Sequence, residues 1–258
     1  MDRPQARLPR GYRLLHLDEV DSTNAEALRR AADGERGPQW VWADSQLKGR
    51  GRQGRHWESR SGNLYASLLL ALPVRASASA GLSLGAPVAV RATLKALLPS
   101  NLPVDLKWPN DVLLPDGKVA GILLESIAGE ASTVVVIGCG INVRDAPLGT
   151  RYGATALARH GIEVTALQVL EELARQMDDM LRLWNNGKDF ETIRRLWLDA
   201  AKGIGSRISI KAGGETVEGI FEGLSADGAL LLRLDSGALE VVRAGDVSMA
   251  FGGDIQAP

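Results

Sequence analysis

A run of strand-like segments in the middle of the chain places the strongest constraint on its fold. Val104–Leu114 and Lys118–Ile127 are largely apolar and flank Asp116-Gly117, a dipeptide that favours tight turns with positive φ. Thr133–Val143, which is rich in β-branched residues, is predicted as a further strand. This succession follows a mixture of strands and helices, and it predicts an α+β fold whose mostly antiparallel sheet is backed by helices.

Strand and helix signals alternate in the remaining residues before Lys202. Thr23, with Glu26 three residues later, is typical of a capping box at the start of the first helix. Pro87 lies inside a helical pattern, where a first turn or a kink would tolerate it. The predicted strands are Gly11–Val20, Trp40–Ala43 and Leu64–Leu72, and the predicted helices are Ala25–Ala32, Gly81–Leu98, Leu167–Trp184 and Phe190–Ala200.

The pattern changes after Lys202. Arg207–Phe251 consists of short strand-like segments separated by glycine-containing turns. Five short strands at this spacing predict a small β-barrel. We therefore expect two domains, one over residues 1–203 and a smaller one over residues 204–258.

The bulk composition limits the classes of function. The 258 residues include 30 Lys+Arg and 31 Asp+Glu, so the chain lacks the broad basic surface that long nucleic acids usually require. A single cysteine, Cys139, excludes an internal disulfide and suits a reducing compartment, and no apolar run reaches membrane-spanning length. We expect a cytoplasmic protein without membrane association. The three histidines are far apart, so no metal-ligand spacing is visible.

Residues 48–57 read K-G-R-G-R-Q-G-R-H-W and are called the Gly-Arg loop below. Its glycines allow the backbone to approach a ligand closely, and guanidinium groups grip phosphate or carboxylate oxygens with two N–H groups. The loop is predicted to hold a small anion, and Trp57 offers a flat face for a base or ring. Its four cations are Lys48, Arg50, Arg52 and Arg55.

Two further segments carry polar groups in unusual positions. D-S-T-N, residues 21–24, is either only a helix cap or a set of hydroxyl and amide groups that bind a small polar ligand. K-W-P-N-D, residues 107–111, contains a turn stiffened by proline. Its polar residues Lys107, Asn110 and Asp111 lie in an apolar region and need partners there.

G-K-V-A-G-I-L, residues 117–123, and G-C-G-I-N-V, residues 138–143, also combine glycines with polar groups. Lys118 is either a solvated hairpin residue or a cation that reaches a ligand carboxylate. The glycines of the second segment can simply mark a bulge. Asn142 could contact a heteroaromatic edge with its amide, and Cys139 is interpreted as a packed small residue, since no base accompanies it.

Together and in this order, these motifs resemble those of biotin–protein ligases of the monofunctional type that lacks an N-terminal DNA-binding domain. The resemblance runs through D-S-T-N, Q-L-K-G-R-G-R-Q-G-R-H-W, K-W-P-N-D, K-V-A-G-I-L-L-E and G-C-G-I-N-V. It implies a class II synthetase-like catalytic domain and a C-terminal SH3-like barrel. It also implies a ligase that uses ATP and Mg2+ to make biotinyl-5'-AMP and transfers biotin to a lysine of a biotin carboxyl carrier domain.

The resemblance also implies roles for individual residues. Catalysis is assigned to Lys118, Arg52 and Asp111. The sequence identifies no dedicated general base for the transfer step, for which Asp111 is a candidate. The nucleotide, with its magnesium, is assigned to Arg52, Arg55, Trp57, Asn110, Asp111 and Asn142. Biotin is assigned to Ser22, Thr23, Asn24, Gln46, Gly49, Arg50, Lys118, Gly121 and Leu123. The chain departs from the family pattern at Leu47-Lys48, where small residues are common.

Two other functions compete with this reading. A lipoate ligase or octanoyl transferase shares the catalytic architecture, but the Gly-Arg loop, K-W-P-N-D and the C-terminal barrel disfavour it. A nucleic-acid-binding module could use the loop arginines with Trp57 as a stacking platform, but the near-neutral charge disfavours it. Because 20 residues precede Asp21, too few for a helix-turn-helix module, we expect no specific DNA binding. Sheet edges of this fold class can pair side by side, which allows a homodimer.

Overall fold

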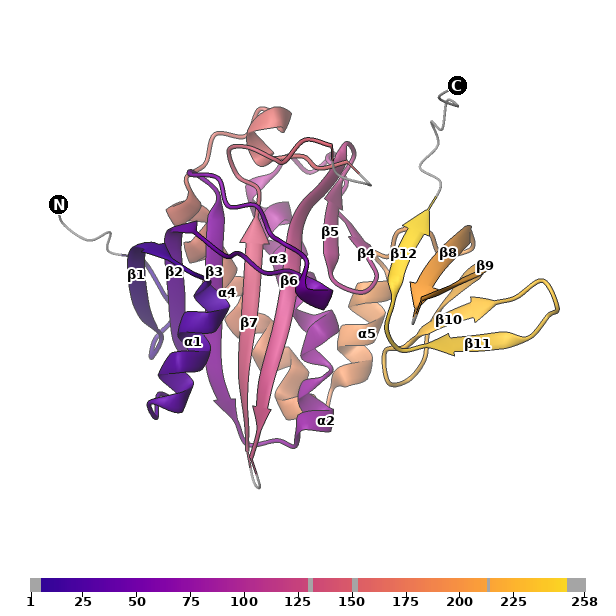
Figure 1. Ribbon diagram of the computed structural model, residues 1–258, viewed down its shortest axis with the longest axis horizontal. Coiled ribbons are helices and arrows are strands. Elements are labelled where there is room, and N and C mark those ends of the chain that lie inside the picture. The colour runs from indigo at the N-terminus through magenta and orange to yellow at the C-terminus, as the bar shows by residue number, and fades with distance from the viewer. Residues whose placement is uncertain (1–5, 130–131, 150–152, 213, 250–258) are drawn as a thin grey trace.

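The computed structural model describes residues 6–129, 132–149, 153–212 and 214–249, which form two sheets (Figure 1). The first sheet has seven strands in the order β1-β2-β3-β7-β6-β5-β4. β1 and β2 are parallel and every other neighbouring pair is antiparallel, which confirms the mostly antiparallel sheet. The strands are β1 (Arg13–Val20), β2 (Gln39–Gln46), β3 (Leu64–Leu72), β4 (Asp105–Lys107), β5 (Asp111–Leu114), β6 (Gly117–Ala128) and β7 (Thr133–Ile141).

Helices cover both faces of this sheet, as its alternating side chains require. In β3, Leu68 and Leu70 join the large core under α3 and α4, whereas Leu69 packs in a smaller cluster with Ala27 of α1. Figure 1 shows α1 on one face and α3, α4 and α5 on the other. The helices are α1 (Thr23–Ala32), α2 (Ala76–Ser79), α3 (Leu82–Leu97), α4 (Ala166–Trp184) and α5 (Phe190–Leu198), with 3-10 turns η1 (Arg52–Gly54), η2 (Leu157–His160) and η3 (Asn185–Gly187).

Two local predictions are wrong. Val104–Leu114 is not one strand, because β4 ends at Lys107 and β5 begins at Asp111. Pro109 between them lacks the N–H that a strand ladder needs. The Thr23–Glu26 capping box is absent: Ser22 is the N-cap, with no side-chain cap, and the Thr23 hydroxyl contacts other side chains. A capping box that was not predicted, between Thr165 and Gln168, begins α4 instead.

The C-terminal residues form the five short strands expected from the sequence. They are β8 (Arg207–Ala212), β9 (Glu215–Leu224), β10 (Leu230–Arg233), β11 (Leu239–Val242) and β12 (Asp246–Met249), in the order β11-β10-β9-β8-β12. Closure of this sheet into a barrel stays a prediction, and residues 250–251 of the expected range lie outside the described residues.

The second sheet packs directly on the first part of the chain. Phe221 of β9 and Trp197 of α5 belong to one continuous apolar core. The guanidinium of Arg194 donates to the Leu224 carbonyl at 2.8 Å, and the indole N–H of Trp108 donates to the Gly228 carbonyl at 3.4 Å. This docking brings β12 close to the Gly-Arg loop. None of the helices in the described part of the chain is long and apolar enough to cross a membrane.

Candidate active site

A cavity of about 930 Å3 lies between the Gly-Arg loop, the first sheet and the start of β12. Figure 1 shows the loop crossing in front of β7 and β6, on the same face as α1. Every predicted site residue except Gly49 lines the cavity, whereas the exposed Lys48 of the loop does not. The lining residues that were predicted are Ser22, Thr23, Asn24, Gln46, Arg50, Arg52, Arg55, Trp57, Asn110, Asp111, Lys118, Gly121, Leu123 and Asn142.

The Gly-Arg loop is a compact hairpin. Arg50 and His56 form an antiparallel bridge, and the N–H of Gly51 donates to the carbonyl of Arg55 at 2.7 Å. Gly49 is required by packing, since a Cβ there would lie 2.3 Å from the Trp57 carbonyl oxygen. This role explains why Gly49 does not line the cavity: it lets the two arms of the loop approach each other.

The three arginines of the loop contact acceptors on both sheets. Arg50 pairs with Glu125 of β6 at 3.1 Å, and Arg55 pairs with Asp246 of β12 at 2.9 Å. Arg52 donates to the side-chain oxygen of Asn110 and to the carbonyl of Gly245, both at 3.4 Å. Burial lowers the pKa of Arg52. The second sheet therefore completes the surroundings of a loop that sequence analysis assigned to the first domain alone.

Trp57 lies over a hollow made by two glycines in paired strands. Gly121 of β6 is opposite Gly140 of β7, and a Cβ on either would lie within 2.8 Å of the indole. The Nζ of Lys118 lies 5.1 Å from the ring centroid, in range of a cation–π interaction. The glycines of both motifs thus make room for the indole ring, which explains why both positions are occupied by glycine.

Lys118 also forms an ion pair, because its Nζ lies 2.6 Å from Oδ1 of Asp111. The side chain of Asn110 donates to the Ile122 carbonyl at 2.6 Å and so fixes the turn before β5. Lys107, at the end of β4, is only 4% exposed, and burial lowers its pKa. Several cationic groups therefore face one cavity, as expected of a site for anions.

The opposite end of the cavity is polar and nearly closed to solvent. Thr23 donates its backbone N–H to Oε1 of Gln46 at 2.9 Å. Asn24 donates its amide to the Leu123 carbonyl at 3.3 Å and to Glu125 at 2.8 Å. Ser67 Oγ lies 2.8 Å from Thr23 Oγ1 and 2.6 Å from Asn24 Oδ1.

The roles of Ser67 and Glu125 were not predicted from the sequence. Ser67 is the one serine in the otherwise apolar strand β3, which is a signal that a polar partner lies opposite. Glu125 ends the K-V-A-G-I-L-L-E motif and joins Asn24 to Arg50. Asp246 was also missed, since no local pattern in β12 connects it with a loop near residue 50.

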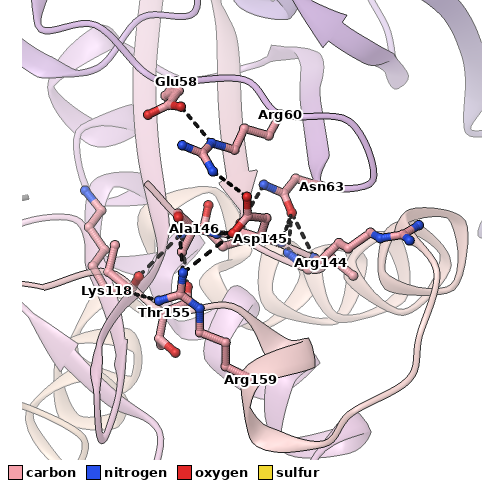
Figure 2. Close-up of polar contacts among 12 residues, drawn as sticks. Glu58, Arg60, Asn63, Lys118, Arg144, Asp145, Ala146, Thr155 and Arg159 are labelled. Atoms are coloured by element: carbon pink, nitrogen blue, oxygen red, sulfur yellow. Dashed lines mark hydrogen bonds and ion pairs between the residues drawn. The ribbon is translucent and has the colours of Figure 1, made fainter. Parts of the chain in front are cut away.

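An ion-pair network fixes the chain beside Lys118 (Figure 2). Arg60 pairs with Asp145 at 2.5 Å, which keeps the pKa of that carboxyl below its usual value, and Arg159 approaches Asp145 from the other side at 3.6 Å. The backbone N–H of Lys118 donates to the Gly153 carbonyl at 3.2 Å, and the Lys118 carbonyl accepts from the N–H of Thr155 at 3.0 Å. The backbone of Lys118 is thereby held on this side of β6.

Asn142 and Cys139 of the G-C-G-I-N-V motif are both buried. Asn142 donates its amide to the Thr155 carbonyl at 3.1 Å, so part of its hydrogen-bonding capacity is used by the protein. Burial raises the pKa of the Cys139 thiol to about 12, which agrees with a packing residue and not with a nucleophile.

Comparisons with known proteins agree with this geometry. The sequence matches the Biotin/lipoate A/B protein ligase family over residues 19–142 and the Biotin protein ligase C terminal domain over residues 203–249. It is 39% identical over 243 residues to a Biotin--[acetyl-CoA-carboxylase] ligase of Paracoccus denitrificans, covering 92% of this chain and 100% of the relative. This chain belongs to the biotin protein ligase family.

Two further relatives support the assignment. A Biotin--[acetyl-CoA-carboxylase] ligase of Mycobacterium tuberculosis is 35% identical, over 92% of this ligase and 89% of the relative. The solved structure of the Aquifex aeolicus biotin protein ligase, in complex with biotin and ATP, has a TM-score of 0.74 and 30% identity, covering 92% of this chain and 97% of that one. The family predicted from the ordered motifs is confirmed.

Proposed function

We propose that this ligase joins biotin to ATP, forming biotinyl-5'-AMP, and transfers the biotin to a lysine of a biotin carboxyl carrier domain of a carboxylase. The observation that carries the proposal is the cavity in which residues of all five motifs meet. The names of the Paracoccus and Mycobacterium relatives and the biotin and ATP in the Aquifex structure support the same activity. The lipoate alternative is not favoured, because these relatives are biotin ligases.

Biotin is proposed to bind between the polar end of the cavity and Lys118. Its ring would lie at Ser22, Thr23, Asn24 and Gln46, and its chain along Gly121 and Leu123. Its carboxylate would then reach Lys118, with Arg50 and Gly49 closing the loop above it. Hydrogen-bonding groups at one end and a cation at the other match the two polar ends of this substrate.

ATP is proposed to lie beside Trp57, with the adenine on the indole ring. Arg52 and Arg55 would contact phosphate, and Asn110 and Asn142 would border the nucleotide. Acceptors at the start of the second sheet hold both arginines at this end of the cavity, and a guanidinium has further N–H groups that can bind phosphate.

The first step brings two anions together. A biotin carboxylate oxygen attacks the α-phosphorus of ATP, and the bond to pyrophosphate breaks. Lys118 and Arg52 would screen the repulsion and stabilise the negative charge that grows on the α-phosphate. In the second step the lysine amine of the carrier domain attacks the acyl carbon and AMP leaves. Asp111 is the candidate base for this amine.

The protein offers few ligands for a magnesium ion of its own. Among the described residues no three His, Cys, Asp or Glu side chains cluster as a metal site. Mg2+ often takes only one or two carboxylates together with phosphates and water, so Asp111 with Asn110 fits an ion that arrives with ATP. When bound, such an ion neutralises phosphate charge on the leaving pyrophosphate.

Calorimetry and a transfer assay test the proposal together. Titration with biotin, then with ATP and magnesium, is expected to show tight binding of both and release of pyrophosphate. Labelled biotin should appear on an isolated carrier domain, whereas labelled lipoate should not. Transfer of lipoate in preference to biotin would reject the proposal.

Three expectations of the sequence analysis stay predictions. The absence of specific DNA binding is contradicted if a gel shift detects tight binding to an operator at physiological salt. Pairing of exposed sheet edges into a homodimer is measured by sedimentation. A reducing compartment such as the cytoplasm remains our proposal on the basis of the single, buried Cys139.

A further inference from the structure

Four oxygen atoms form a short chain at the polar end of the cavity. Asn24 Oδ1 lies 2.6 Å from Ser67 Oγ, Ser67 Oγ lies 2.8 Å from Thr23 Oγ1, and Thr23 Oγ1 lies 3.1 Å from Gln46 Oε1. Thr23, Asn24 and Gln46 line the cavity, whereas Ser67 is fully buried behind them. Ser67 is therefore within reach of the ligand-facing groups without facing the ligand.

Both ends of this chain are fixed as hydrogen-bond acceptors. The amide nitrogen of Asn24 donates to the Leu123 carbonyl and to the Glu125 carboxylate, so the amide oxygen must face Ser67. Oε1 of Gln46 accepts the backbone N–H of Thr23, and the amide nitrogen of Gln46 donates to Ser59 at 3.1 Å. Rotation of the Asn24 amide would set its oxygen against two acceptors, and rotation of the Gln46 amide would set its NH2 group against the N–H of Thr23.

The four oxygen atoms make three contacts with one another, but only two hydroxyl hydrogens are available to form hydrogen bonds in these contacts. The hydrogens are most favourable in the two shortest contacts, of 2.6 and 2.8 Å. Thr23 then donates to Ser67, and Ser67 donates to Asn24. The longest contact, 3.1 Å between Thr23 Oγ1 and Gln46 Oε1, is left as two acceptors side by side at the cavity wall.

We infer that Ser67 is a positioning residue that turns the Thr23 hydroxyl hydrogen away from the cavity. Thr23 Oγ1 and Gln46 Oε1 then present neighbouring lone pairs to the ligand, and they select a ring that carries N–H donors. The cyclic urea of biotin has two such donors and the dithiolane ring of lipoate has none. This inference rests on the proposed function and assigns its ring specificity to a residue outside the cavity.

Replacement of Ser67 by a residue without a hydroxyl should reverse the direction in which the Thr23 hydroxyl donates. In Ser67→Ala the Thr23 hydroxyl loses its acceptor and turns to Gln46, where it uses up the lone pair that the ligand N–H needed. A ring in which oxygen replaces one ureido N–H should then be rejected less strongly. If Ser67 had a merely structural role, its replacement would weaken the binding of biotin and the binding of this analogue by the same factor.

The test measures the dissociation constants of biotin and of its two cyclic carbamate analogues, each with oxygen in place of one ureido N–H. Wild-type protein should bind at least one analogue about 30-fold more weakly than biotin, and Ser67→Ala should reduce that ratio to about threefold. Ser79→Ala, which removes a buried hydroxyl far from the cavity, should keep the wild-type ratio.

An unchanged ratio in a folded Ser67→Ala variant overturns the inference. If that variant does not fold, as judged by thermal melting, Ser67→Cys retains a weaker donor of similar size and should give an intermediate ratio; a wild-type ratio would again overturn the inference. Wild-type protein that binds biotin no better than lipoate overturns the proposed function itself, so the two failures are distinguishable.

Discussion

The guanidinium of Arg55 in the Gly-Arg loop lies 2.9 Å from the carboxylate of Asp246 at the start of β12. Together with the contact from Arg52 to the Gly245 carbonyl, this pair links the loop to the second sheet. The loop is therefore held from both sides, by Glu125 on the first sheet and by Asp246 on the second. We therefore expect the position of the loop over the cavity to depend on how the two parts of the chain dock.

We predict that Arg55→Ala and Asp246→Ala each shorten the lifetime of bound biotinyl-5'-AMP. Because the pair is partly exposed, the effect of each should be about two- to fivefold. The double variant should lose little more than either single variant, since both remove one interaction. The measurement is the rate of AMP appearance after preloading without acceptor, and fully additive effects would show that the pair does not hold the loop.

Arg52→Ala should speed loss of the adenylate more strongly, because Arg52 is more buried than Arg55 and its removal opens the loop to water. The same preloading experiment measures the lifetime. Lys48→Ala is the matched control, since Lys48 is an exposed loop cation that does not line the cavity. An unchanged lifetime for Arg52→Ala would remove Arg52 from the protective role.

Lys118→Ala should slow formation of the adenylate itself. The loss of a cation beside the reacting carboxylate is expected to reduce the rate of pyrophosphate release by roughly 10²- to 10³-fold. Lys95→Ala, an exposed helix lysine, serves as the control. Normal pyrophosphate release by Lys118→Ala would exclude Lys118 from the chemistry.

Substitution of two glycines in β7 should affect the two substrates differently. A Cβ at Gly138 would lie 2.1 Å from Oδ1 of Asn24, so Gly138→Ala should weaken the binding of biotin by about tenfold or more. A Cβ at Gly140 would lie 2.6 Å from the indole of Trp57, so Gly140→Ala should instead raise the KM for ATP by a similar factor. Each variant is the control for the other, and equal effects on both substrates would contradict the assignment.

Glu35 should make stability depend on acid pH. Its carboxylate accepts from Arg13 and from the N–H groups of Arg36 and Gly37, which lowers its pKa from 4.5 to about 2. The unfolded chain binds more protons between these values, so the contribution is present above pH 4.5 and is lost as the pH falls toward 2.

The free energy of unfolding of Glu35→Gln should therefore be about 1 kcal/mol lower than that of wild type at pH 6. The difference should nearly vanish near pH 2. Urea unfolding at both values measures the difference. Glu163→Gln, at an exposed position, is the control. A difference that stays constant across this range would show that the Glu35 carboxylate does not contribute through its charge.

Much of the fold and site could be predicted because the relevant signals are local. Asp116-Gly117 predicted the turn before β6, and glycine spacing around Arg50 and Arg52 predicted a loop that faces a cavity. The strand break at Pro109 was missed, since the apolar residues on both sides outweighed one proline. The capping box failed because the Thr23 hydroxyl has tertiary partners that compete with the helix N–H groups.

The sequence by itself determined the inventory of the site: the cationic loop, the glycines and polar groups of the other motifs, and the order of motifs that identifies the family. Only the tertiary structure decided which groups meet. Ser67 and Glu125 reach Asn24 because β3, β7 and β6 are neighbours under α1, and Asp246 reaches Arg55 because the second sheet docks beside the loop. Such pairings depend on strand order and domain packing, which act between residues far apart in the chain and leave no local pattern.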